Sequence, residues 1–240
     1  MKFTPALHAE WIKIRTLRSQ VATLCAVLLA TVAFSLLASA DADAADADTL
    51  FTAFFGVGFG QIAAVAFGTT AVAAEFQGGA LGVSLTAVPR RGRWFAAKAT
   101  AIALPVLAVG LATGLLSWAV GRAALGGRAP TFGTAEGLRA AVGCGLYLTL
   151  MALLAAGLTA VLRSGVAALG ILIPFLLIVS FVVGDVSGSV ADFLPDRAGQ
   201  VALHGSWEGT LGPWTGLTVT ALWTAAALAA GAWRVRRRDA

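Results

Sequence analysis

The chain has 240 residues, of which 58% are hydrophobic and only 12% are charged, with a formal net charge of +5. Soluble globular domains carry about a quarter charged residues, so this composition excludes an ordinary soluble domain and indicates a membrane protein. Arginine outnumbers lysine by 14 to 3, and alanine and glycine are abundant, which is typical of a bacterial chain from a GC-rich genome.

The first stretch of the chain, residues 3–18, reads "FTPALHAEWIKIRTLR" and precedes any apolar run of membrane length. Thr4 can cap a helix, and Pro5 suits its first turn. Apolar residues then recur every three or four positions and give the helix one apolar face: Phe3, Leu7, Trp11, Ile14 and Leu17. The pattern predicts an amphipathic helix that lies in the membrane interface over about residues 1–20, with Lys13 and Arg18 facing phosphates or solvent. The alternative is a charged segment that only sets topology.

Six apolar runs follow, and none of them contains Asp, Glu, Lys or Arg. About 20 apolar residues suffice to cross roughly 30 Å of hydrocarbon. We therefore expect an all-α membrane protein with one permease-sized domain over residues 1–240 and six transmembrane helices. The predicted spans are about 21–40, 51–74, 99–120, 141–162, 165–184 and 212–233. Pro105 and Pro174 are expected to kink the third and fifth of them.

The second run carries small residues four apart, namely Gly56, Gly60, Ala64 and Gly68. This spacing places them on one helix face, and close helix packing in lipid uses such faces. The stripe predicts a tight contact within the bundle or between subunits. Because the chain has 28 glycines, a chance match is the alternative.

The basic residues fall mostly on one side of the predicted membrane. With the N-terminus inside, 13 Lys and Arg lie inside and 4 lie outside, which by the positive-inside rule places both termini in the cytoplasm. The segment between the last two spans, residues 185–211, is then extracellular. Its apolar residues are expected to rest against the outer leaflet, namely Phe193, Leu194, Val201, Leu203, Trp207 and Leu211. The basic tail is expected to contact anionic lipid rather than nucleic acid.

Motifs for chemistry are absent from the chain. It has no GxxxxGK[ST] loop, no HExxH and no GxSxG. His8 and His204 fall on opposite sides of the predicted membrane, so they cannot share a metal. We therefore expect no catalytic residue, metal site or cofactor in this chain, and no enzyme activity. Any energy for work would come from a partner.

A charged stretch, "AEFQGGALGVSLTAVPRRGRWFAAK" (residues 74–98), interrupts the apolar runs on the cytoplasmic side. Glu75 ends the second span, and Gly78 and Gly79 allow the backbone to change direction. Leu81, Leu85 and Val88 then predict a short helix with one apolar face, which Pro89 ends. The basic residues Arg90, Arg91, Arg93 and Lys98 follow. Such a helix can lie on lipid or fit a groove of a cytoplasmic protein.

This stretch resembles the loop after the second span in permeases of ABC-2-type ATP-binding-cassette exporters. The start "HAEWIKIRTLRS" is similar to the helix before the first span in the actinobacterial branch of that family. Many relatives have Gly-Thr where this chain has Gly79-Ala80. The resemblance implies a type-V-exporter-like bundle of six helices with a long outer segment between spans 5 and 6.

The resemblance also implies a mechanism and partners. A cytoplasmic ABC ATPase subunit, which binds ATP and Mg, would dock against a coupling helix in residues 75–98 and against the connecting helix before span 1. The coupling residues implied are Glu75, Gly78, Gly79, Leu81, Leu85, Pro89, Arg90, Arg91 and Arg93, and those of the connecting helix are Trp11, Lys13 and Arg15. A second permease copy or a sister permease would complete the pathway in the bacterial plasma membrane.

The expected activity is export of an amphiphilic or hydrophobic substrate. Two alternatives stay open, namely an immunity or regulatory membrane subunit of the same fold and a non-transporting membrane scaffold.

Overall fold

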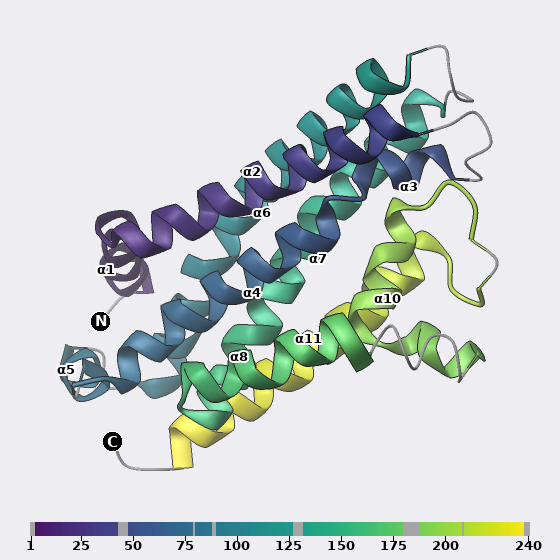
Figure 1. Ribbon diagram of the computed structural model, residues 1–240. Helices are drawn as coiled ribbons and strands as arrows, with labels where there is room; N and C mark the ends of the chain where they lie inside the picture. The colour runs from purple at the N-terminus through teal and green to yellow at the C-terminus, as the bar shows by residue number, and fades with distance from the viewer. Residues whose placement is uncertain are drawn as a thin grey trace.

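The computed structural model describes residues 3–42, 48–78, 80–87, 90–126, 132–179, 188–207 and 209–237, and within these ranges it contains helices and no strand. The long helices lie side by side and form one bundle (Figure 1). In the first half of the chain the elements are α1 (Phe3–Thr16), α2 (Arg18–Asp41), α3 (Thr49–Phe54), α4 (Val57–Ala73), the 3-10 helix η1 (Ala74–Phe76), α5 (Ala80–Ala87) and α6 (Arg91–Leu125). In the second half they are α7 (Thr134–Leu162), α8 (Gly165–Pro174), the π-helix η2 (Phe175–Val179), the 3-10 helix η3 (Gly188–Phe193), α10 (Pro195–Gln200), the 3-10 helix η4 (Val201–Leu203) and α11 (Pro213–Arg237).

Five helical stretches are long and apolar enough to cross a membrane. They are Arg18–Asp41, Thr49–Phe76, Arg91–Leu125, Thr134–Leu162 and Pro213–Arg237. The expectation of an all-α membrane protein is therefore confirmed at this level. The fifth predicted span, 165–184, corresponds to a shorter apolar helix, Gly165–Ile178, and residues 180–184 of that prediction lie outside the described part of the chain.

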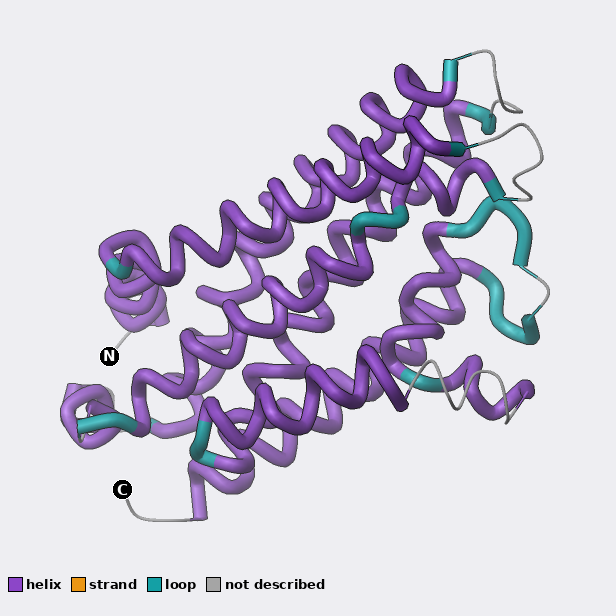
Figure 2. Tube along the Cα trace, in the orientation of Figure 1, coloured by secondary structure: helices purple, strands orange, loops and turns teal. Residues whose placement is uncertain are grey.

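Helix α7 is the centre of the bundle and the most buried of the long helices. It packs against α4, α6 and α11, while α2 packs against α4 and α6 on one side (Figures 1 and 2). Both chain termini lie at the same end of the bundle, together with α1 and α5 (Figure 1). We call this end the terminal end and the other the opposite end.

The small residues of α4 let two neighbouring helices approach its backbone closely. A Cβ at Gly56 would lie 1.9 Å from the carbonyl oxygen of Thr31 in α2, and a Cβ at Gly68 would lie 2.0 Å from that of Ala152 in α7. Gly60 faces Thr31 as well, and Ala64 is fully buried. The stripe thus packs inside the chain's own bundle, against two different helices. The proximity of backbones allows the van der Waals contact that holds helices together in lipid.

The two prolines expected to kink helices behave differently. Helix α6 continues through Pro105 without a break, and at 35 residues it is the longest helix described. Pro174, by contrast, is the last residue of α8, and the π-helix η2 follows directly. Proline removes a backbone donor, and a π turn is one way in which a helix accommodates the loss.

Helix α10 and η4, which precede α11, pack against the bundle. Within α10 and η4, Ala198, Gly199 and Leu203 are buried, and Thr220 of α11 donates a hydrogen bond to the carbonyl oxygen of Pro195 at 2.7 Å. A Cβ at Gly199 would lie 2.3 Å from the ring of Tyr147 in α7. The expectation that Val201 and Leu203 rest against the outer leaflet is wrong, because both are buried against the bundle.

Asp48 and His204 join the start of α3 to the C-terminus of η4 at the opposite end. The Asp48 carboxylate accepts hydrogen bonds from the backbone N–H groups of Phe51 at 3.0 Å and Gly205 at 3.1 Å, and it contacts His204 Nδ1 at 2.9 Å. The His204 ring also stacks on Phe51, with 4.0 Å between ring centroids. Burial lowers the pKa of His204 below its ordinary value of 6.5, and the opposing effect of Asp48 is smaller. The imidazole is therefore neutral in the folded protein near pH 7.

This lowered pKa makes stability depend on pH. Between the pKa in the folded state and 6.5, the unfolded chain binds more protons at His204 than the folded chain does, so stability falls as the pH drops through that window and levels off below it. We expect the melting temperature in detergent to fall between pH 7.5 and pH 5.5 more steeply for the unsubstituted chain than for His204→Gln. Equal slopes for the two proteins would contradict this account.

Candidate coupling site at the terminal end

The stretch between α4 and α6 is a short helix held between two membrane-length helices. Helix α4 ends in η1, and Gly78 then has a φ of +59°, a left-handed conformation that favours glycine. Helix α5 follows, and α6 begins at Arg91. Gly79 and Pro89, which were predicted to belong to this site, lie outside the described residues. The local sequence thus provides a turn, a single short helix and a return into the bundle.

Four charged side chains meet beneath this helix and form what we call the charge cluster: Glu10, Lys13, Glu75 and Lys98. Lys13 Nζ lies 3.0 Å from Glu10 Oε1 and 2.8 Å from Glu75 Oε1. Lys98 Nζ lies 2.7 Å from Glu75 Oε1 and also pairs with Glu10 Oε2. Each ammonium therefore contacts both carboxylates, and the formal charges sum to zero.

Three of the four side chains of the charge cluster are almost entirely removed from solvent. The side chains of Glu10, Glu75 and Lys98 are 4 to 5% exposed, whereas that of Lys13 is 40% exposed and forms the outer edge. Burial opposes the charge on Lys13, but hydrogen bonds to Glu75 and Glu10 outweigh it and raise the pKa of Lys13 above its ordinary value. Buried charges persist only when they are paired in this way.

Ser84 connects α5 to the charge cluster. Its hydroxyl donates a hydrogen bond to Glu75 Oε2 at 2.8 Å and accepts one from Lys13 Nζ at 3.2 Å. The network therefore joins four elements, namely α1, η1, α5 and α6. A displacement of α5 is resisted by the contacts of Ser84 to α1 and η1, which Lys98 in turn links to α6, so these elements are expected to move as one unit.

The sequence predicted part of this network. Lys13 and Glu75 were among the predicted site residues, and the structure brings them together. Trp11 is partly buried on α1 and Arg15 is exposed, and neither belongs to the charge cluster. Glu10 and Ser84 were not predicted as site residues, and Lys98 was expected only as a basic residue at the start of a span. The available signal was Glu10 three residues before Lys13, a spacing that places both on one side of a helix.

The two leucines of α5, Leu81 and Leu85, point into the protein rather than away from it. Leu81 is 6% exposed, and Leu85 is partly buried against the core. They therefore do not form a free apolar face for another protein. The outward side carries Val83, which is 73% exposed, and Gly82, where an added Cβ would meet no atom within 4 Å. This small surface is what α5 presents to solvent or to a partner.

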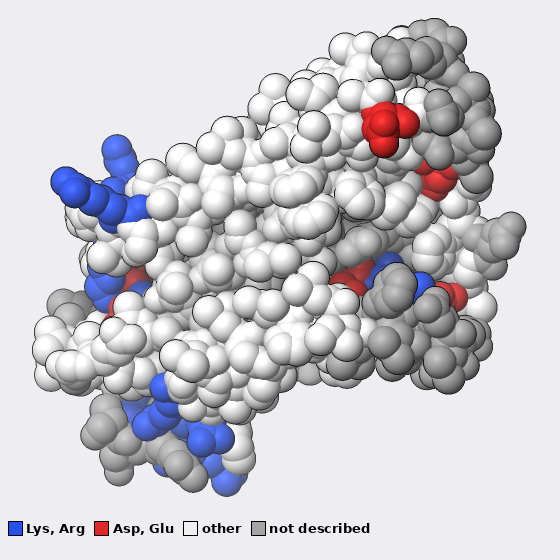
Figure 3. All heavy atoms as spheres, in the orientation of Figure 1, with Lys and Arg blue, Asp and Glu red and all other residues white. Residues whose placement is uncertain are grey.

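Basic residues surround α5 at the terminal end (Figure 3). Arg90 and Arg93 are exposed beside the start of α6, and Arg91 donates a hydrogen bond to the carbonyl oxygen of Val235 at 3.1 Å. That contact brings the predicted coupling arginines next to the basic end of α11, which carries Arg234, Arg236 and Arg237. The site is thus a small apolar surface on α5, which is hydrogen-bonded to the charge cluster and bordered by basic residues.

Among the described residues there is no group of three or more His, Cys, Asp or Glu side chains that could hold a metal ion. What this arrangement can do is hold a helix rigidly at the surface while connecting it to two long helices. A comparison with protein-family models and a comparison with curated proteins each found no match to this chain.

Proposed function

We propose that this chain is the permease subunit of an ABC exporter, in which a separate cytoplasmic ATPase subunit docks on α5. The observation that carries the proposal is the charge cluster beneath α5. A helix of eight residues has little stability of its own, yet here Ser84 joins it by hydrogen bonds to Glu75 and Lys13, two members of the charge cluster that links α1, η1 and α6. A force applied at the exposed Val83 would therefore be transmitted to the membrane helices.

The proposed topology has six crossings with both termini in the cytoplasm of a bacterium. The excess of cations at the terminal end supports this orientation (Figure 3). The short apolar helix Gly165–Ile178 would begin the fifth crossing, at about 1.5 Å of rise per residue. The type-V-exporter-like arrangement, with α1 lying in the interface as a connecting helix, is part of the same proposal. Membrane lipid would surround the bundle.

The ATP and Mg would be bound by the partner subunit, since the chain has no phosphate-binding loop of its own. A second copy of the chain or a sister permease would supply the other half of the pathway. The apolar membrane helices, which carry few charges, suit an amphiphilic or hydrophobic substrate. This chain would then contribute the path and the coupling, and no catalytic step.

A charge at Val83 tests the docking surface. We expect Val83→Asp to reduce by tenfold or more the amount of ATP-binding-cassette protein that co-purifies with the tagged chain from its native host, because an ion would have to be desolvated in the contact. The control is Ser206→Asp, which adds the same charge at an exposed position of the opposite end. Since Val83 is 73% exposed, the melting temperature should not change.

Two results would contradict the proposal. One is equal recovery of the ATPase with both variants, which would show that α5 is not the contact. The other is recovery of no such ATPase with the unsubstituted chain, which would favour an immunity, regulatory or scaffold role for the same fold.

A further inference from the structure

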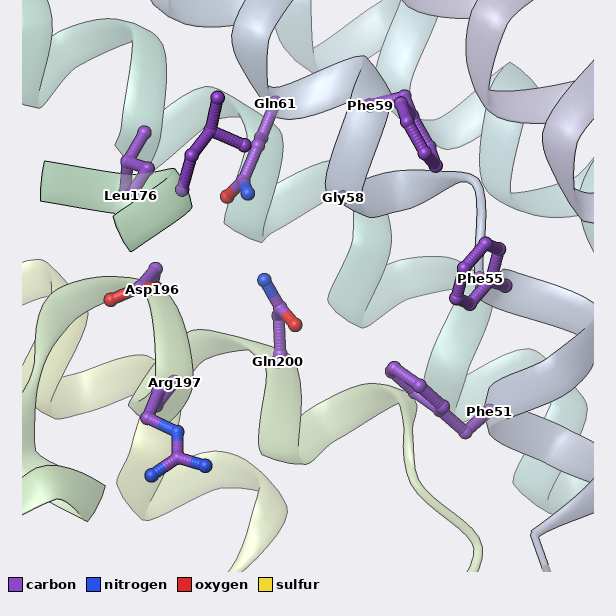
Figure 4. A pocket seen from close by; sticks show the side chains of 10 residues that line it. Phe51, Phe55, Gly58, Phe59, Gln61, Leu176, Asp196, Arg197 and Gln200 are labelled. Atoms are coloured by element: carbon purple, nitrogen blue, oxygen red, sulfur yellow. The ribbon is translucent and has the colours of Figure 1, made fainter. Parts of the chain in front are cut away.

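A cavity of about 390 Å³ opens in the half of the bundle away from the charge cluster. Its walls come from α3, α4, η2 and α10 (Figure 4). The volume falls within the range of about 300–1,000 Å³ that small-molecule sites occupy. All of the lining residues belong to described parts of the chain.

One wall of the cavity is aromatic. Phe51, Phe55 and Phe59 follow one another at intervals of four residues across the break between α3 and α4, and their rings line one side (Figure 4). Ring centroids of Phe55 and Phe59 are 6.0 Å apart, and these two side chains are 45% and 40% exposed. Exposed neighbouring rings provide an apolar surface for the flat or chain-like part of a ligand.

The polar wall of the cavity carries two carboxamides, Gln61 from α4 and Gln200 from α10. Tyr147 donates a hydrogen bond to Gln61 Oε1 and accepts one from Gln200 Nε2 at 3.2 Å. Since the tyrosine hydroxyl has one proton, it donates to one amide and accepts from the other. Gln61 Nε2 and Gln200 Oε1 are not used in these two bonds, and the two side chains approach one another at the cavity (Figure 4). Together they offer N–H donors and a carbonyl acceptor.

The charges at the cavity cancel. Asp196 and Arg197 are neighbours on α10, and both line the cavity. Asp196 is only 4% exposed, so this part of the cavity is shielded from water, and a ligand that brought a net charge into it would lose hydration at a large cost. An uncharged ligand fits this lining better than an anion or a cation, because it leaves the existing balance unchanged.

The polar wall is held rigidly. Helix α10 is fixed to α7 by the close approach of Gly199 to Tyr147 and to α11 by the hydrogen bond from Thr220 to Pro195. The π-helix η2, which follows Pro174, adds Leu176 to the lining. Polar groups that are already in place lose little conformational freedom when a ligand binds.

We propose that this cavity binds a small uncharged amphiphile, with its apolar body against Phe51, Phe55 and Phe59 and an amide or hydroxyl head between Gln61 and Gln200. As the site for a transported substrate, the cavity rests on the proposed function. Binding itself does not require the ATPase, so the two proposals can fail separately.

The test uses the full chain in lipid nanodiscs, without any ATPase. The probes are naphthylacetamide, naphthylmethylamine and naphthylacetate at pH 7, which share an aromatic body and differ in the charge of the head. Equilibrium dialysis against empty nanodiscs measures saturable binding. We expect one site per chain, with naphthylacetamide bound at least tenfold more tightly than either charged probe.

Two variants examine the two walls. Phe55→Ala and Gln200→Leu should each weaken naphthylacetamide binding by about fivefold or more. The matched controls are Phe193→Ala, a similarly exposed phenylalanine away from the cavity, and Gln77→Leu, an exposed glutamine at the terminal end; both should bind as the unsubstituted chain does. Melting temperatures show that each variant is folded.

The inference is overturned if no saturable binding exceeds that of empty nanodiscs, if the three probes bind equally, or if the cavity variants bind as the controls do. If the chain binds the probe selectively but associates with no ATPase, the ligand site is supported and the exporter proposal is contradicted. If it associates with an ATPase but does not bind the probe selectively, the exporter proposal is supported and the ligand site is contradicted.

Discussion

Replacing Lys98 by methionine should lower the free energy of unfolding by about 3–5 kcal/mol, which is the usual cost of removing one partner from a buried ion pair. The substitution leaves Glu10 and Glu75, both at most 4% exposed, with only Lys13 between them. Two buried carboxylates cannot share one half-exposed ammonium without a net charge remaining inside. The measurement is denaturant unfolding of the purified chain in mixed micelles.

A second substitution separates charge from packing. In Lys98→Met, Glu10→Leu the remaining cluster is Lys13, Glu75 and Ser84, which is balanced. Replacing a buried ion pair with apolar residues is often neutral or stabilising, so most of the stability should return. If the double variant is less stable than Lys98→Met alone, the loss arises from side-chain packing and the charge cluster does not hold these elements together.

Gly68→Ala should destabilise the bundle by about 3 kcal/mol, the upper part of the usual range for an overpacked core. The added Cβ would lie 2.0 Å from the carbonyl oxygen of Ala152, and backbone cannot rotate away as a side chain can. Helices α4 and α7 would have to separate along their contact. Unfolding under the same conditions as above measures the effect.

Gly58→Ala is the matched control for this prediction. It lies in the same helix, but a Cβ there would meet no atom within 4 Å. Alanine favours helix over glycine, so the control should be neutral or more stable by up to about 1 kcal/mol. Equal effects at the two positions would mean that helix propensity, and not the contact with α7, determines the result.

The sequence predicted the helical membrane class because apolar runs without charge are a direct consequence of the bilayer's thickness. It did not predict where helices break or extend. The single run 51–74 is divided at Phe55 and Gly56 into α3 and α4, and α6 begins at Arg91, eight residues before its apolar run. A helix continues into polar sequence when other elements pack against it, and periodicity within one segment does not contain that information.

The candidate site was predicted in part for a similar reason. Glu75 stood out because a carboxylate ends a span, but its partners Lys13 and Lys98 are 62 and 23 residues away in the sequence, and only tertiary packing brings them together. The apolar spacing of Leu81 and Leu85 indicated the helix correctly, yet the same spacing fits an inward or an outward face. The structure gives the inward one.

The most direct test of the central claim is a photocrosslink from Val83, the exposed residue of α5. A photoreactive amino acid is placed there in the native host, and the adducts are identified by mass spectrometry. Leu222, which is 65% exposed on α11, is the control for contact with lipid. The account predicts an adduct at Val83, and not at Leu222, with a soluble protein that carries a nucleotide phosphate loop. Adducts at Val83 only to lipid or to the chain itself, while such ATPases are expressed, would contradict it.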